Sequence, residues 1–128
     1  MTEAKTESHN RALIVEDEIL IALDLEAAMT GLGFEICDLA PDGDEARSLA
    51  MSHRPDVVLV DVYLGGTREG IETARWLREV CDVSVVFVTA HTDEATIERI
   101  KEIVPGSPIL SKPVYRERLA EAVAKAIY

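Results

Sequence analysis

The sequence is poor in aromatic residues and in positive charge. Phe, Trp and Tyr make up 5% of the 128 residues, so a core must be built mainly from Val, Ile, Leu and Ala. Lysine and arginine number 13 against 24 acidic residues, a net charge of −11. This balance argues against a nucleic-acid surface, which needs a basic stripe, and against binding to an anionic membrane. It is typical of a cytoplasmic protein or of one with an acidic cation site.

Cysteine and long apolar runs are also scarce. Cys37 and Cys81 form no C-x-x-C pair or Cys/His cluster, so we expect two reduced thiols and no structural zinc site. No apolar stretch approaches the roughly 20 residues of a membrane span. Residues 1–10 lack the apolar segment of a signal peptide. We expect these residues to form a short flexible tail and residues 11–128 to form one domain.

What is present is an alternation of strand-like and helix-like segments. Apolar runs predict strands at 12–15, 34–40, 56–62, 83–90 and 108–113. Helical spacing predicts helices at 18–33, 42–53, 70–80, 93–104 and 116–128. Because continuous apolar runs suit strands that are covered on both faces, we expect an α/β fold. The expected architecture is a flavodoxin-like (βα)5 doubly wound parallel sheet with strand order 2-1-3-4-5.

Apolar spacing also predicts which helix faces point inward. In the first helix the inward residues are expected to be Ile19, Leu23 and Met29, with either Leu25 or Glu26. In the third helix they are expected to be Ile71, Ala74, Leu77 and Val80. Asp42 or Asp44 is expected to cap the second helix.

Polar residues follow the predicted strands where each strand ends. These residues are Glu16 and Asp17 after the first strand, Asp61 at the third, Thr89 at the fourth and Lys112 at the fifth. Doubly wound sheets bind ligands at the carboxyl ends of their strands, near the switch point between the first and third strands. We therefore expect the three acids to meet in one pocket.

Acids that lie this close need a compensating positive charge. Two carboxylates 4 Å apart repel by about 4 kcal/mol at an effective dielectric near 20. Mg²⁺ suits a site with few carboxylates and several waters, and Lys112 adds a further positive charge. A carboxylate beside Mg²⁺, a lysine and a threonine hydroxyl is equipped to attack a phosphoryl group. The pattern predicts a phospho-aspartate site.

Over about residues 11–128 the chain resembles the receiver domain of two-component response regulators. The resemblance rests on the acidic pair, on Asp61, on the Thr-Ala pair after the fourth strand and on the Lys-Pro pair after the fifth. It implies that Asp61 is the phosphoacceptor, that Thr89 is the switch hydroxyl and that Lys112 contacts the phosphate. It also implies a cis peptide bond between Lys112 and Pro113.

The resemblance further implies a magnesium site. Its ligands would be Asp17, Asp61 and the backbone carbonyl of Tyr63, with Glu16 binding through a water. Glu16 stands where the family more often has Asp, and Ile109 stands where the family has its switch aromatic, three residues before the lysine. Tyr63 and His91 occupy positions that tend to influence how fast the family loses its phosphoryl group.

The resemblance implies a cytoplasmic signalling switch rather than an enzyme. Its phosphodonor would be a sensor histidine kinase or a histidine phosphotransfer protein. Phosphorylation would change the face of the fourth helix, fifth strand and fifth helix, to which a downstream protein partner binds. No direct contact with nucleic acid or membrane is expected, and homodimerisation remains open.

Three alternative functions share parts of this pattern. A pseudo-receiver, which binds proteins without phosphorylation, is favoured by Ile109 and opposed by the complete set of site residues. A phosphatase of the haloacid dehalogenase type needs a second Asp two residues after its nucleophile, and that position is Tyr63 here. An FMN carrier of this fold needs a Gly/Ser/Thr-rich loop after the first strand, where this sequence is acidic.

Overall fold

The computed structural model describes residues 10–128. Apart from Asn10, the predicted tail at residues 1–10 lies outside the described residues. Strands and helices alternate in the order β1 Arg11–Val15, α1 Ile19–Gly31, β2 Glu35–Ala40, α2 Gly43–His53, β3 Val57–Val60, α3 Glu69–Cys81, β4 Ser84–Thr89, α4 Glu94–Ile103, β5 Ile109–Ser111 and α5 Arg116–Ile127.

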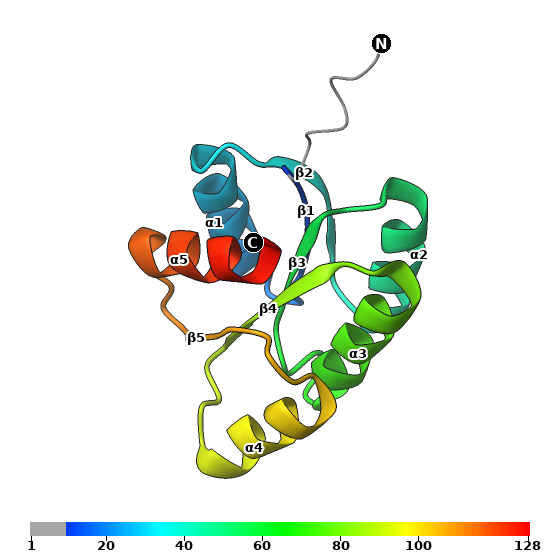
Figure 1. Ribbon diagram of the computed structural model, residues 1–128, viewed down its shortest axis with the longest axis vertical. Coiled ribbons are helices and arrows are strands. Elements are labelled where there is room, and N and C mark those ends of the chain that lie inside the picture. Colours follow the sequence, from blue (N-terminus) through cyan, green and yellow to red (C-terminus); the bar gives the residue numbers. More distant parts are fainter. Residues whose placement is uncertain (1–9) are drawn as a thin grey trace.

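The five strands form one parallel sheet in the order β2-β1-β3-β4-β5, as the sequence predicts (Figure 1). β1, β3 and β4 are interior strands and are buried along nearly their whole length. β2 and β5 form the two edges and are partly exposed. The continuous apolar runs therefore mark the strands that are covered on both faces.

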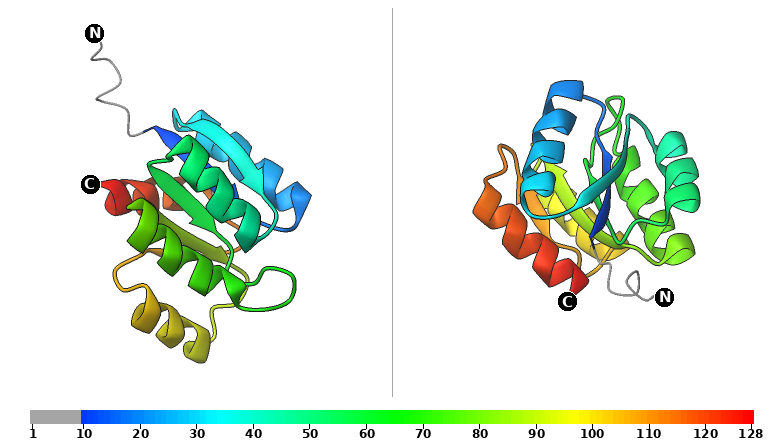
Figure 2. Two further views of the ribbon diagram at one scale, coloured as in Figure 1. Left: turned by 90° about the vertical axis from the view of Figure 1, so that its right-hand side faces the viewer. Right: turned by 90° about the horizontal axis from the view of Figure 1, so that it is seen from above.

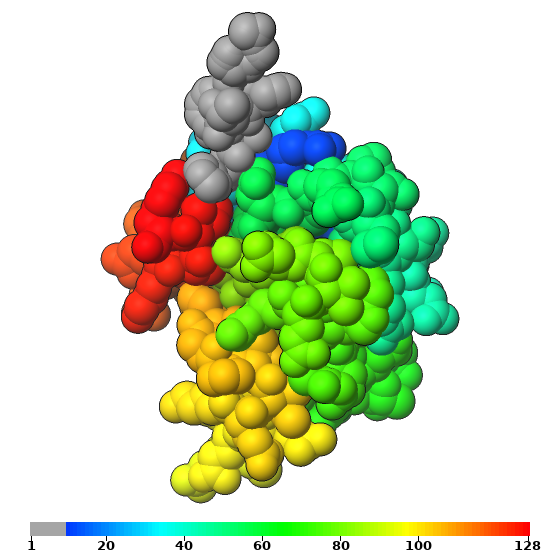
Figure 3. All heavy atoms as spheres, turned by 45° about the vertical axis from the view of Figure 1, so that its right-hand side comes forward, coloured from blue at the N-terminus to red at the C-terminus, as the bar shows by residue number. Residues whose placement is uncertain are grey.

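Helices cover both faces of the sheet (Figures 1 and 2). On one face, Ala12 and Ile14 of β1 share a core with α1 and α5. On the other face, Leu13 and Val15 share a core with α2, α3 and α4. Figure 3 shows α3 in front, with α2 and α4 on either side of it. Among the helices of residues 10–128, none combines the length and the apolar character that a membrane span requires.

Two predicted helix faces need correction. In α1 the buried residues are Ala22, Leu25 and Met29, whereas Ile19 and Leu23 are exposed. In α3 the prediction is right for Ile71, Ala74 and Leu77 and wrong for Val80, which is 53% exposed. The steps of three residues from Ile71 to Val80 add up to about two and a half turns, which brings Val80 to the opposite side of the helix.

Of the two predicted caps for α2, the structure selects Asp42. The Asp42 side chain accepts a hydrogen bond from the Glu45 amide at 2.9 Å. Asp93 caps α4 in the same way by accepting the Thr96 amide at 3.1 Å. Such caps satisfy amide groups that have no partner inside the helix.

Candidate functional site

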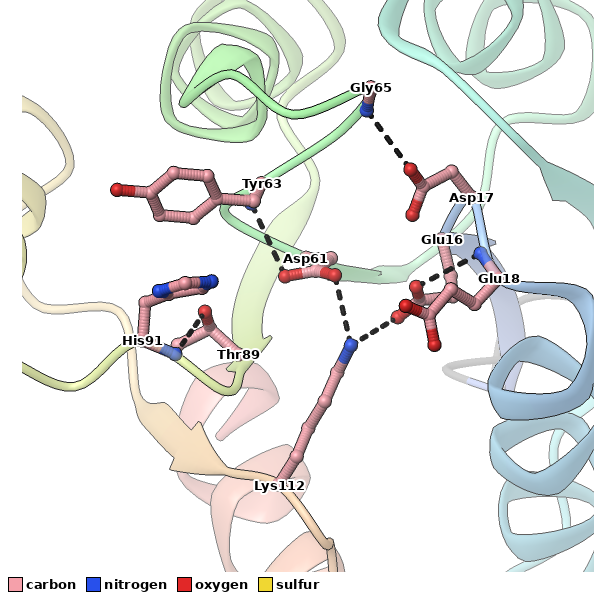
Figure 4. Close-up of polar contacts among 9 residues, drawn as sticks. All are labelled: Glu16, Asp17, Glu18, Asp61, Tyr63, Gly65, Thr89, His91 and Lys112. Atoms are coloured by element: carbon pink, nitrogen blue, oxygen red, sulfur yellow. Dashed lines mark hydrogen bonds and ion pairs between the residues drawn. The ribbon is translucent and has the colours of Figure 1, made fainter.

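The carboxyl ends of β1, β3, β4 and β5 bring the predicted site residues to one edge of the sheet (Figure 4). Glu16 and Asp17 follow β1 directly, and Asp61 follows β3, the neighbour of β1. Thr89 is the last residue of β4, and Lys112 follows β5. Figure 4 shows the Lys112 side chain extending toward Asp61 and Glu16.

Lys112 is the cation that joins the two buried carboxylates. Its Nζ atom lies 2.9 Å from Asp61 Oδ2 and 2.9 Å from Glu16 Oε1. Burial alone lowers the pKa of the Lys112 ammonium, but the contacts with Glu16 and Asp61 outweigh burial and raise it. The lysine is therefore held in its charged form at the centre of the site.

Glu16 is only 3% exposed and has a partner on each of its carboxylate oxygens. Its Oε2 atom accepts the Glu18 amide at 3.2 Å. Its buried Oε1 atom lies 2.9 Å from Lys112 Nζ, which is the charged partner of this oxygen. Burial raises the pKa of the Glu16 carboxyl, against the effects of Lys112 and the Glu18 amide, and the charge of Asp61 raises it further. Burial thus disfavours the charged form of Glu16 despite Lys112, and a further cation beside it would stabilise that form.

Asp17 is exposed and contacts the loop between β3 and α3. Its Oδ2 atom accepts the Gly65 amide at 3.0 Å. Gly65 has a φ of +63°, a backbone conformation that residues with a side chain rarely adopt. This contact holds the loop that follows Asp61 against the end of β1.

The Asp61 carboxylate has a different partner on each oxygen. Lys112 contacts Oδ2, while Oδ1 accepts the Tyr63 amide at 3.3 Å. The backbone of Asp61 packs against the start of α3, where the Gly70 amide donates to the Val62 carbonyl at 2.9 Å. A Cβ atom on Gly70 would overlap the Asp61 carbonyl oxygen. Glycine is therefore required at position 70 for α3 to approach the end of β3 this closely.

The acidic cluster fits a hard divalent cation. Carboxylate oxygens of Glu16, Asp17 and Asp61 all lie within 4.8 Å of one another. Glu16 is buried with Lys112 as the charged partner of its Oε1 atom, and Asp17 is open to solvent. An all-oxygen set with room for water is what Mg²⁺ prefers. That the Tyr63 carbonyl completes this set stays a prediction.

Thr89 lies on the side of Asp61 away from the acids, and its surroundings were not predicted. The Thr89 hydroxyl accepts the His91 amide at 3.0 Å. The rings of His91 and Tyr63 have centroids 4.0 Å apart at 36°, and Arg68 Nε donates to the Tyr63 hydroxyl at 3.0 Å. In the sequence, a contact between Tyr63 and His91 is indicated only by their positions, because each stands two residues after a site residue.

Two further predictions concern β5. The peptide bond between Lys112 and Pro113 is cis, as the resemblance implies. Ile109, at the position of the family's switch aromatic, is half-buried and packs against the core that also contains α3 and α4. An aliphatic side chain therefore occupies the position from which an aromatic ring would connect the site to the surface.

Comparisons with known proteins agree with this geometry. A sequence profile described as the response regulator receiver domain matches residues 12–124. The transcriptional regulatory protein PdtaR of Mycobacterium tuberculosis is 34% identical over 126 residues, which is 98% of this chain and 60% of that protein. The phyllosphere-induced regulator PhyR of Methylorubrum extorquens is 32% identical over 118 residues, which is 91% of this chain and 43% of that protein.

The chain thus spans about half the length of these curated relatives. Among solved structures, the signal receiver domain of a modulated diguanylate cyclase from Desulfovibrio desulfuricans is similar along almost its whole length. Its TM-score is 0.83 at 36% identity, covering 91% of this chain and 92% of that one. The similarity therefore extends over the whole sheet with its helices.

Proposed function

Because the chain belongs to the response regulator receiver family, whose members are two-component signalling modules rather than conventional enzymes, we propose that it accepts a phosphoryl group on Asp61. The observation that carries the proposal is the contact between the Lys112 ammonium and a buried Asp61 carboxylate, beside two further acids. A buried acid with a charge partner and an adjoining cation site is a candidate functional group.

The two oxygens of Asp61 would have separate tasks. Lys112 contacts Oδ2, so Oδ1 attacks the phosphorus of the donor. The bond between phosphorus and the donor's histidine nitrogen, or the oxygen of acetyl phosphate, breaks, and the leaving group keeps the electron pair. Mg²⁺, held by Glu16, Asp17, Asp61 and the Tyr63 carbonyl, would neutralise charge on the transferred group. The Thr89 hydroxyl accepts the His91 amide and can donate its own proton to a phosphoryl oxygen.

The surface beside the site supports a protein as the phosphodonor. Ile19, Leu20 and Leu23, in the first two turns of α1, are 60%, 74% and 45% exposed. They come directly after the acids of the site in the chain. A group of exposed apolar side chains is typical of a protein contact. We propose that a histidine kinase or histidine phosphotransfer protein covers this surface in the cytoplasm while its phosphohistidine reaches Asp61.

The surface around the backbone of Lys112 supports the predicted output face of α4, β5 and α5. A hollow of about 460 Å³ runs along β5 and the start of α5 and is lined by Ile109, Lys112 and Tyr115, among others. Lys112 therefore borders both the site and this surface. A change in its contacts on phosphorylation would alter the hollow, to which a downstream protein would bind.

The test is the intact mass after incubation with acetyl phosphate, with and without Mg²⁺, for the wild type and for Asp61→Asn. We expect the wild type to gain one phosphoryl group only with Mg²⁺, and the variant to gain none. Titration with beryllofluoride and Mg²⁺ accompanies it, because a stable mimic detects a site whose phosphoryl group is lost too fast to observe. A wild type that gains no mass and binds no beryllofluoride supports the pseudo-receiver alternative instead.

A further inference from the structure

Arg68 reaches back from the start of α3 to the loop that follows the phosphoacceptor. Its Nε atom donates a hydrogen bond to the Tyr63 hydroxyl at 3.0 Å. Arg68 is exposed, whereas Tyr63 is half-buried against the core. Arg68 therefore binds the hydroxyl of Tyr63, whose backbone amide contacts Asp61 in the site.

Tyr63 in turn contacts the loop between β4 and α4. Its ring stands 4.0 Å from the His91 ring, centroid to centroid, at an interplanar angle of 36°. His91 is fixed at its backbone, where its amide donates to the Thr89 hydroxyl at 3.0 Å. The series Arg68, Tyr63, His91 and Thr89 thus joins the two loops that flank Asp61.

This series lies on the side of Asp61 that the phosphoryl group would occupy. Asp61 Oδ2 faces Lys112 and the acids, whereas Oδ1 faces the Tyr63 amide (Figure 4). A group on Oδ1 would extend toward Thr89, with the rings of Tyr63 and His91 between it and the solvent on that side. Displacing or tilting the Tyr63 ring would open a path for water.

We propose that Arg68 is a positioning residue that, through the Tyr63 hydroxyl, holds the Tyr63 ring beside Asp61 and slows hydrolysis of the aspartyl phosphate. The inference rests on the proposed function. In the step that is slowed, a water oxygen attacks phosphorus and the bond from phosphorus to Asp61 Oδ1 breaks. The Asp61 carboxylate is restored, and inorganic phosphate leaves with the protons of the water distributed between it and the solvent.

The competing explanation is that the hydrogen bond between Arg68 and Tyr63 lies on the surface and has no effect on hydrolysis. Four variants distinguish these two explanations. Arg68→Gln removes the guanidinium, and Tyr63→Phe removes only the hydroxyl while keeping the ring and the backbone carbonyl. Arg68→Lys retains a charged donor as a conservative rescue. Arg75→Gln is the matched control, because Arg75 is an exposed arginine of α3 that donates to Glu72 instead.

The experiment loads each variant with acetyl phosphate and Mg²⁺, removes the donor and follows loss of the phosphoryl group by intact mass. We expect Arg68→Gln and Tyr63→Phe each to lose it about two- to tenfold faster than the wild type, the effect of removing one hydrogen bond. The double variant should be no faster than either single one, because both act through one contact. Arg68→Lys and Arg75→Gln should stay within about twofold of the wild type.

The other outcomes are informative as well. An unchanged rate in Arg68→Gln, or additive effects in the double variant, overturns the inference and leaves the proposed function intact. An Arg75→Gln variant as fast as Arg68→Gln also overturns it, because the effect then follows from net charge. Equal thermal midpoints and equal Mg²⁺ affinities across the set support it, since a general loosening of the fold would change both. A wild type that takes up no phosphoryl group overturns the proposed function and this inference together.

Discussion

Lys112 and Asp61 stand 51 positions apart in the chain, and Lys112 Nζ lies 2.9 Å from Asp61 Oδ2. The strand before Lys112, β5, pairs with β4 at the edge of the sheet, whereas Asp61 follows β3 and Glu16 follows β1. The lysine side chain thus reaches past the end of β4 to carboxylates from two strands that β5 does not touch. It closes the site across the sheet.

Replacing Lys112 by Met should destabilise the fold in the absence of divalent cations. Glu16 and Asp61 would remain buried side by side without a cation, and breaking such a buried ion pair by removing one partner costs about 3–5 kcal/mol. Mg²⁺ should restore part of the loss, because it supplies the missing charge. Urea unfolding in EDTA and in Mg²⁺ measures both. Lys125→Met, on an exposed lysine of α5, is the control, and equal midpoints for the two variants in EDTA would contradict the prediction.

Magnesium binding should depend on pH through Glu16. Burial raises the pKa of Glu16 above the ordinary value of a glutamate, so protons compete with the metal at a higher pH than they would at an exposed glutamate. The Mg²⁺ dissociation constant should therefore fall as pH rises through this raised pKa. Calorimetric titrations across this pH range test the prediction. In Glu16→Gln the affinity for Mg²⁺ should be lower and should depend less on pH. An unchanged pH dependence would exclude Glu16 as its origin.

The same raised pKa predicts the sign of a stability change without metal. The folded state holds the Glu16 proton more tightly than the unfolded state. The free energy of unfolding should therefore gain a contribution from Glu16 as pH falls through the raised pKa, and lose it as pH rises. Denaturant unfolding of the wild type and of Glu16→Gln in EDTA isolates this contribution, which the variant should lack.

Gly70→Ala should damage both the fold and the site. The new methyl group would overlap the Asp61 carbonyl and lie 2.7 Å from that of Val62, so α3 or the end of β3 must move. We expect a loss of about 1–3 kcal/mol, typical of overpacking, together with slower uptake of phosphoryl groups from acetyl phosphate. Gly31→Ala is the control, because its methyl group would meet only the end of the flexible Arg116 side chain. Equal stability of the two variants would contradict the prediction, because the fold would then accommodate a methyl group at position 70.

Thr89→Val should uncouple the loop after β4 from the site. The substitution keeps the shape of the side chain and removes the hydroxyl that accepts the His91 amide. In the wild type, beryllofluoride with Mg²⁺ should shift the amide resonances of residues 91–96, because Thr89 would turn toward the phosphoryl mimic. In Thr89→Val these shifts should be reduced at least about twofold, while the mimic still binds Asp61. Identical shifts in both proteins would exclude Thr89 as the switch.

The sheet order and the meeting of the acids were predictable from the sequence for one physical reason. The carboxyl ends of parallel strands share an edge, so Glu16, Asp17 and Asp61 had to come together once the first and third strands were neighbours. The same reasoning placed Lys112 and Thr89 at that edge. None of this depended on how individual side chains pack.

The errors arise where periodicity carries little information. In α1 nearly every residue from Ile19 to Leu25 is apolar, so the spacing does not distinguish the buried Ala22 from the exposed Leu23. The contacts among Arg68, Tyr63 and His91 lie in loops, whose paths follow no repeat. They depend on how two loops pack together, and no pattern within either loop encodes that.

The position of Lys112 so late in the chain has a consequence for biosynthesis. During synthesis, Glu16, Asp17 and Asp61 emerge from the ribosome before Lys112, which stands 51 positions after Asp61. A chain halted before β5 carries three neighbouring negative charges and no ammonium to hold them together. A product truncated there lacks β5 and the ammonium that contacts Glu16 and Asp61 in the folded sheet. The contact between Lys112 and Asp61 can therefore form only after β5, the last strand of the sheet in chain order, has been made.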